Sequence, residues 1–206
     1  MASIIGVETL QHTNGTTAMA FDSGGNISEA NKEYFLVRLT STITGLSDNT
    51  TNVVNFNSSG LVEHDTKSNW DSTNNAYKFD SANGVYLITY AIGIMSPTIT
   101  TETMVDGGVS MMFSTDDFST FENAPQFGTG SRVQNNVGDE TGSIPLSGSI
   151  IYKNTDANMK LQMRVYANTA GSLTYEVAED ANELTGGTFI NGGNSDCTYF
   201  SVVRIA

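Results

Sequence analysis

Residues 85–95, Val-Tyr-Leu-Ile-Thr-Tyr-Ala-Ile-Gly-Ile-Met, form the most apolar stretch of the chain. Alternate residues of an extended strand point to opposite faces. One face carries Val85, Leu87, Thr89 and Ala91, and the other carries Tyr86, Ile88, Tyr90, Ile92 and Ile94. An antiparallel strand with one face in water alternates between apolar and polar residues. Because both faces here are largely apolar, the stretch predicts a strand that fills a sandwich core on one face and needs a cover on the other.

The simplest cover for the second face is another copy of the chain. The pattern therefore predicts an oligomer with an aromatic-rich interface. The alternative is that Tyr86 and Tyr90 lie under a long loop of the same chain.

Other stretches rich in apolar, β-branched and aromatic residues precede and follow residues 85–95. They cover residues 34–39, 52–56, 77–79, 109–113, 143–152, 159–167, 173–177 and 199–205. Turn residues separate them, and no 3.6-residue periodicity is sustained over about a dozen residues. Roughly eight to ten short strands joined by turns predict an all-β sandwich or jelly roll.

The first 32 residues have a different pattern. Two alternating stretches, residues 7–12 and 17–22, flank Asn14-Gly15, which is a strong signal for a β-hairpin. A two-stranded ribbon is only marginally stable alone, so we expect this segment to dock on another body. We assign residues 1–32 to a docking hairpin and residues 33–206 to a head domain.

Composition excludes several classes of partner. The 206-residue chain has 9 basic and 22 acidic residues, for a formal net charge of −13. Nucleic-acid binding needs clustered Lys and Arg, so we expect no nucleic-acid partner. No apolar run is long enough to span a membrane, and residues 1–5 lack the charged start of a secretory signal. We expect neither membrane insertion nor standard secretion.

Catalytic signatures are absent from the sequence. The two histidines, His12 and His64, lie in dissimilar contexts, and no G-x-S-x-G elbow accompanies them. The single cysteine, Cys197, excludes an intrachain disulfide. We therefore expect a protein that is not an enzyme, with a small hydrolase as the remote alternative, because carboxylates can pair in space without a sequence signature.

We expect no cofactor. Calcium is the one ion considered, because acidic turns of the chain offer the oxygen ligands that it takes. Acidic turns occur at Asp106-Gly107, Asp116-Asp117, Gly138-Asp139-Glu140 and Glu179-Asp180. Calcium takes several oxygen ligands, but none of these turns matches an EF-hand loop. Solvated surface acids are the other interpretation.

Residues 33–206 resemble the complement-type and tumour-necrosis-factor-type jelly roll. The resemblance rests on Ala82–Ala91 as the central strand, on Val53–Asn57, on Asn69–Phe79 and on Thr198–Ile205. One departure is Ala76, near the place where the family has a glycine before its Phe. The resemblance implies a ten-stranded antiparallel sandwich that forms homotrimers and binds proteins, glycans or other surfaces. It also implies a threefold contact at the aromatic face, where we expect Tyr86, Ile88, Tyr90 and Ile92.

The first 30 residues are similar to a segment of tail fibres and other structural proteins of marine bacteriophages. The matching stretches are Val7–Met19 and Phe21–Gly25, with Phe21 where isoleucine is commoner. This similarity implies a virion protein: a tail fibre, spike or capsid decoration. Its docking residues toward other virion proteins would be Val7, Leu10, Ala18 and Phe21. The head would contact a host surface glycan or protein, and the alternative is a cellular glycan- or protein-binding module of the same fold.

Overall fold

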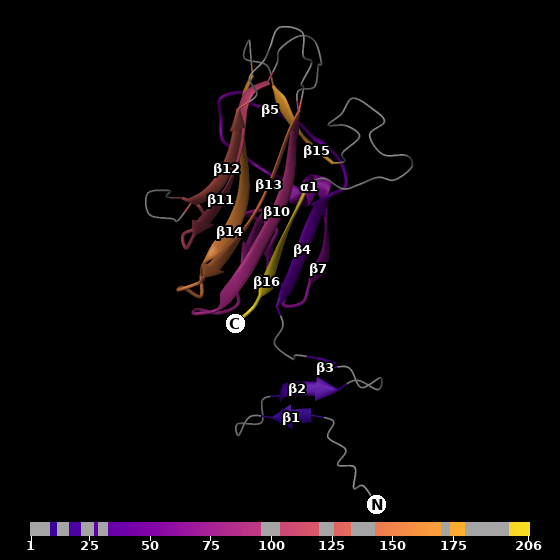
Figure 1. Ribbon diagram of the computed structural model, residues 1–206, viewed down its shortest axis with the longest axis vertical. Coiled ribbons are helices and arrows are strands. Elements are labelled where there is room, and N and C mark those ends of the chain that lie inside the picture. Colours follow the sequence, from indigo (N-terminus) through magenta and orange to yellow (C-terminus); the bar gives the residue numbers. More distant parts are fainter. Residues whose placement is uncertain are drawn as a thin grey trace, which may run out of the picture.

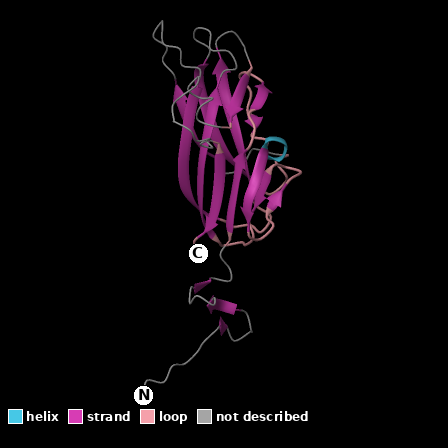
Figure 2. Ribbon diagram, turned by 90° about the vertical axis from the view of Figure 1, so that its right-hand side faces the viewer, coloured by secondary structure: helices cyan, strands magenta, loops and turns pink. Residues whose placement is uncertain are grey.

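The computed structural model describes residues 9–11, 17–21, 27–28, 33–95, 104–119, 126–132, 143–169, 174–179 and 198–206. Most of them lie in antiparallel strands, and the described residues from 33 onward build a two-sheet sandwich whose strands run along its long axis (Figure 1; Figure 2). The all-β jelly roll that the sequence predicts is confirmed.

The first sheet has the strand order β5-β15-β10-β16-β4-β7, and β13 pairs with the other edge of β10. Its strands are β4 (Tyr34–Leu39), β5 (Ile43–Leu46), β7 (Gly60–Asp65), β10 (Val85–Met95), β13 (Ser143–Lys153), β15 (Tyr175–Ala178) and β16 (Tyr199–Arg204). The second sheet has the order β12-β11-β14-β9-β8, with β6 paired to β14. Its strands are β6 (Asn52–Val53), β8 (Trp70–Asp71), β9 (Ala76–Lys78), β11 (Met104–Ser114), β12 (Gln126–Arg132) and β14 (Lys160–Thr169). Short strands such as β6 and β8 add to the ten that were expected.

Strand β10 has the bounds that its apolar run predicts. It pairs with β13 along its whole length, from Val85 opposite Lys153 to Met95 opposite Ser143. Its other edge pairs first with β16 and then with β15. Strand β10 is therefore hydrogen-bonded on both edges, and its apolar side chains point alternately to the two faces of the first sheet.

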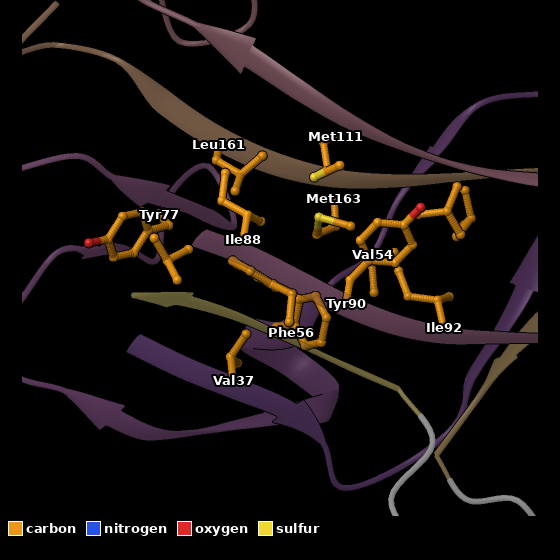
Figure 3. Close-up of a cluster of buried hydrophobic side chains, with 14 of the residues drawn as sticks. Val37, Val54, Phe56, Tyr77, Ile88, Tyr90, Ile92, Met111, Leu161 and Met163 are labelled. Atoms are coloured by element: carbon orange, nitrogen blue, oxygen red, sulfur yellow. The ribbon is translucent and has the colours of Figure 1, made fainter. Parts of the chain in front are cut away.

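One part of the sandwich core is a cluster of aromatic rings. Phe35 of β4 lies 5.4 Å from the ring of Trp70, 4.9 Å from that of Tyr77 and 5.2 Å from that of Phe200, measured between ring centroids. Figure 3 shows a neighbouring part of the core, where Ile88 lies beneath Leu161 and Tyr90 lies beneath Met163, both of the second sheet. Ring pairs at these separations add to the stability that apolar burial gives.

One predicted strand is interrupted. The apolar residues at 52–56 predict a single strand, but only Asn52–Val53 pairs in a sheet, and Phe56–Ser59 forms the one-turn helix α1. The reason is local: the Asn55 side chain accepts a hydrogen bond from the Ser58 amide, 3.2 Å away. Asparagine in this position caps a helix start, while Phe56 remains buried.

The N-terminal hairpin is confirmed and gains a strand. Strand β1 (Thr9–Gln11) pairs with β2 (Thr17–Phe21), and β2 pairs with β3 (Ile27–Ser28) to give a separate three-stranded sheet. None of its strands joins a sheet of the head, and Figure 1 shows it beyond the end of the sandwich where the C-terminus lies. The division at residue 32 stays a prediction.

Candidate functional site

The aromatic face of β10 does not face outward. Tyr86, Ile88, Tyr90 and Ile92 are 0–1% exposed in a single chain and belong to its main hydrophobic cluster. The prediction that these four residues form a contact between subunits is therefore wrong, because side chains that already fill their own core have no surface left for a second copy (Figure 3).

The opposite face of β10 points away from the core. Leu87 lies directly between Ile151 of β13 and Val203 of β16, and Val203 lies opposite Tyr34 of β4. Residues directly opposite one another in an antiparallel sheet share a face. We call these four residues, Ile151, Leu87, Val203 and Tyr34, the outer apolar row, which crosses four adjacent strands on the outside of the first sheet.

Large apolar side chains remain in water on this face. Ile151 is 71% exposed and Leu87 is 37% exposed. Leu61 on β7 is 47% exposed, and Ile205, directly after β16, is 52% exposed. Within the described part of the chain, these four are the large hydrophobic residues that are exposed, and each lies in a strand of the first sheet or directly after one. The outer apolar row makes part of this surface continuous across four strands, and an exposed apolar patch is typical of an interaction site.

The same face is poor in carboxylates, although the chain is strongly acidic. Strands β7, β4, β16, β10 and β13 contain only Glu63 and Asp65. Glu63 pairs with Arg38, with 2.5 Å between Oε1 and Nε, and Asp65 accepts hydrogen bonds from the amides of Asn69 and Trp70. We call the outward side of these five strands the uncovered face. Depletion of charge and exposure of apolar groups are properties of the central part of protein interfaces.

The outside of the second sheet also carries apolar residues, but the chain covers them itself. Ala76 and Met112 form a small cluster with Phe118, which is only 8% exposed. Phe118 lies in the turn that follows β11, where Asp117 and Phe118 have φ angles of 58° and 63°. Left-handed backbone at such residues costs about 1–2 kcal/mol each, which is comparable to the roughly 2–3 kcal/mol gained by burying a Phe side chain.

Ion pairs hold this covering turn. The Lys160 ammonium contacts the carboxylates of Asp71, 2.5 Å away, and of Asp117. Partial burial raises the pKa of Asp71, but hydrogen bonds from Lys160 and Asn74 outweigh burial and lower it to about 2. The Arg164 guanidinium lies 5.8 Å from the centre of the Phe118 ring.

Asp116-Asp117 is one of the acidic turns considered for calcium, and a cation of the protein itself already contacts one of its carboxylates. Lys160 pairs with Asp117, and the Ser114 hydroxyl donates a 2.6 Å hydrogen bond to Asp116. In the described ranges, no three or more His, Cys, Asp or Glu side chains gather as a metal would require. Residues 138–140 and Asp180 lie outside the described residues.

A buried carboxylate lies where the head begins, at a position that sequence patterns do not single out. Glu33, directly before β4, is 1% exposed and accepts hydrogen bonds from the Tyr77 hydroxyl and from Asn69, 2.8 Å away. Burial, with the nearby Glu33 carboxylate, raises the pKa of Tyr86 to about 12. Both phenols are therefore protonated at neutral pH, and the hydrogen bonds from Tyr77 and Asn69 hold Glu33 at the start of the first strand of the head.

The predicted docking residues fall on the N-terminal sheet. Leu10 lies in β1, and Ala18 and Phe21 lie in β2, while Val7 lies outside the described residues, as does His12. The register places Leu10 opposite Met19 and Phe21 opposite Ile27. The one helix in the described ranges, α1, has four residues, so none there is long enough to cross a membrane.

Comparison with solved structures gives the fold. The structure of murine APRIL at pH 5.0 matches 85% of this chain and 100% of that chain with a TM-score of 0.50 and 7% sequence identity. The structure of Eiger TNF from S. frugiperda matches 85% of this chain and 93% of that one, with a TM-score of 0.50 and 10% identity. This chain has the tumour-necrosis-factor-type jelly-roll fold. The globular domain of zebrafish complement 1qA is also similar, with a TM-score of 0.40, 10% identity, and 84% and 95% of the two chains covered.

At such low identities the likeness concerns the fold alone. No protein-family model matches the chain, and no curated protein matches it.

Proposed function

We propose that this protein is a non-enzymatic structural component of a bacteriophage particle, either a tail fibre, a spike or a capsid decoration. Residues 1–32 attach to other virion proteins, and the jelly-roll head projects and contacts the host surface. Two features support this: the similarity of residues 7–25 to a segment of phage fibre proteins, and the presence of a small N-terminal sheet that no strand of the head joins. A cellular glycan- or protein-binding module of the same fold is the alternative.

The head works as a homotrimer in this proposal, and the uncovered face is the contact between its subunits. The observation that carries self-association is the outer apolar row, with Ile151 71% exposed at one end. Full burial of one Leu or Ile side chain stabilises an assembly by about 1.5–3 kcal/mol. Leu61, Leu87, Ile151 and Ile205 are 37–71% exposed, so covering them recovers a part of this free energy in each subunit. The number three comes from the resemblance to trimeric jelly rolls.

Charge favours a second copy of the chain as the occupant. Two copies with a net charge of −13 repel one another over most of their surfaces. The uncovered face offers Arg38 and Lys153 and holds a single outward carboxylate, Glu63, already paired with Arg38. It is therefore a surface on which another acidic subunit can pack with little repulsion.

Antibody labelling of purified phage particles tests the proposed function. The full chain should be detected on particles, and a chain of residues 33–206 should fold and assemble but be missing from them. Absence of the full chain from particles, together with release in a secreted form from its own cell, would favour the cellular binding module instead.

A further inference from the structure

His64 lies on the uncovered face, at the border of its apolar area. It is exposed on β7 and lies opposite Leu36 of β4. Its ring centroid is 5.3 Å from that of Tyr34, the last member of the outer apolar row. Leu61, three residues earlier on the same strand, is 47% exposed. His64 thus lies beside the partly buried ring of Tyr34 and on the same strand as the exposed Leu61.

Few charged groups are near His64. Strand β4 presents Tyr34 and Arg38, and the carboxylate of Glu63 is already paired with Arg38. Asp65 lies opposite the buried Phe35, and its two carboxylate oxygens accept the amides of Asn69 and Trp70. Lys67 in the following turn is a further cation on this element. No uncommitted carboxylate from these groups is available to compensate a charged imidazole.

We infer that His64 is a proton-sensitive control of self-association, so that the neutral imidazole permits a second copy to cover the face and the protonated one opposes it. This inference rests on the proposed self-association through the uncovered face. Covering the face removes water from His64, and removal of water disfavours the charged form of histidine.

The direction of the effect follows from linkage. An imidazole titrates ordinarily near pH 6.5. If the assembled state favours the neutral imidazole, lowering the pH through this range shifts the equilibrium toward the free chain. The reason is that only the free chain accepts the proton without a free-energy penalty. A preference of one pKa unit at each site corresponds to a tenfold change in affinity.

Sedimentation velocity from about pH 8 to about pH 5.5 tests this inference with three chains. They are the full-length wild type, His64→Gln, and His12→Gln as the matched control at the other histidine. For the wild type and His12→Gln, the protein concentration at which half of the chains are assembled should rise about tenfold or more at the lower pH. His64→Gln should change much less, while circular dichroism shows all three heads folded.

Two results would overturn the inference. One is an equal pH response of His64→Gln and the wild type, which would assign the response to carboxylates. The other is tighter assembly of the wild type than of His64→Gln at low pH, which would mean that the neighbouring subunit supplies a carboxylate to His64. Single chains at about pH 8 in all three samples would instead refute self-association itself, and the proposed contact with it.

Discussion

The two sheets of the head differ in whether the apolar residues on their outer faces are covered by the chain. On the second sheet, the turn after β11 folds back and places Phe118 over Ala76 and Met112, with two residues in left-handed backbone. On the first sheet, Leu87 and Ile151 lie opposite one another and remain exposed. Among the residues that the structure describes, the chain thus covers an apolar patch on the second sheet and leaves one on the first sheet exposed. The uncovered side is where another molecule gains most by binding.

The same contrast occurs within β10. Its even-numbered residues are buried in the subunit, and its odd-numbered residues, apart from the buried Gly93, lie on the uncovered face. Substitutions on the two faces should accordingly separate folding from assembly.

The largest effect is expected inside the sandwich. Tyr90→Asp places a carboxylate at a position that is 1% exposed. An unpaired buried charge costs more than about 4–5 kcal/mol, which is a large part of the stability of a domain. The head should fail to fold, as read from the loss of its cooperative thermal transition by circular dichroism. A well-folded single chain would mean that Tyr90 faces a partner after all.

The next effect concerns the outside of the same strand. Leu87→Asp should leave the head folded, with a melting temperature close to that of the wild type, but should prevent assembly, because a carboxylate then lies at the centre of the outer apolar row. Ser110→Asp, at an outward position of β11 on the second sheet, is the matched control and should assemble normally. Normal assembly of Leu87→Asp would move the contact away from this face.

A smaller effect is expected at the covering turn. Phe118→Ala uncovers Met112 and should lower the free energy of unfolding by about 2 kcal/mol, less than the roughly 3–5 kcal/mol typical of a central aromatic residue, since only a small cluster lies beneath it. Chemical denaturation measures this loss. The mass of the assembly should not change, and its loss in this variant would show that the covered side also contributes to the contact.

The smallest effect is the acid response of the ion pairs that hold this turn. The folded pKa of Asp71, about 2, is below its ordinary value of 3.8. The stabilisation is therefore present above about pH 4 and is lost as the pH falls toward 2. For a pair this close to the surface it amounts to about 1 kcal/mol or less. The difference in unfolding free energy between wild type and Asp71→Asn should shrink over that interval, and a constant difference would assign it to packing.

The sequence is sufficient to predict the fold and the central place of β10, since an eleven-residue apolar run between turn residues is typical of a buried strand. Residue size also indicates which face of that strand is buried. Tyr86, Ile88, Tyr90, Ile92 and Ile94 are large without interruption, whereas the other face passes through Thr89, Ala91 and Gly93. Size alone therefore favours the face that the structure buries, against the predicted subunit contact at Tyr86 and Tyr90.

Other parts of the site depend on pairings that sequence patterns do not contain. The exposure of Ile151 depends on its register with Leu87, because Ile150 beside it is equally apolar and packs against the core. Likewise, only the fold brings Lys160 to Asp71 and Asp117, which are separated from it by 89 and 43 residues. Pairings between distant strands determine both features.

The mass of the full chain in solution tests the central claim, that copies assemble through the uncovered face. Sedimentation equilibrium at about pH 8, where an ordinary histidine is neutral, should give three times the chain mass of 22.0 kDa for the wild type and a single chain mass for Leu87→Asp. A wild-type mass of one chain at every concentration would contradict the claim.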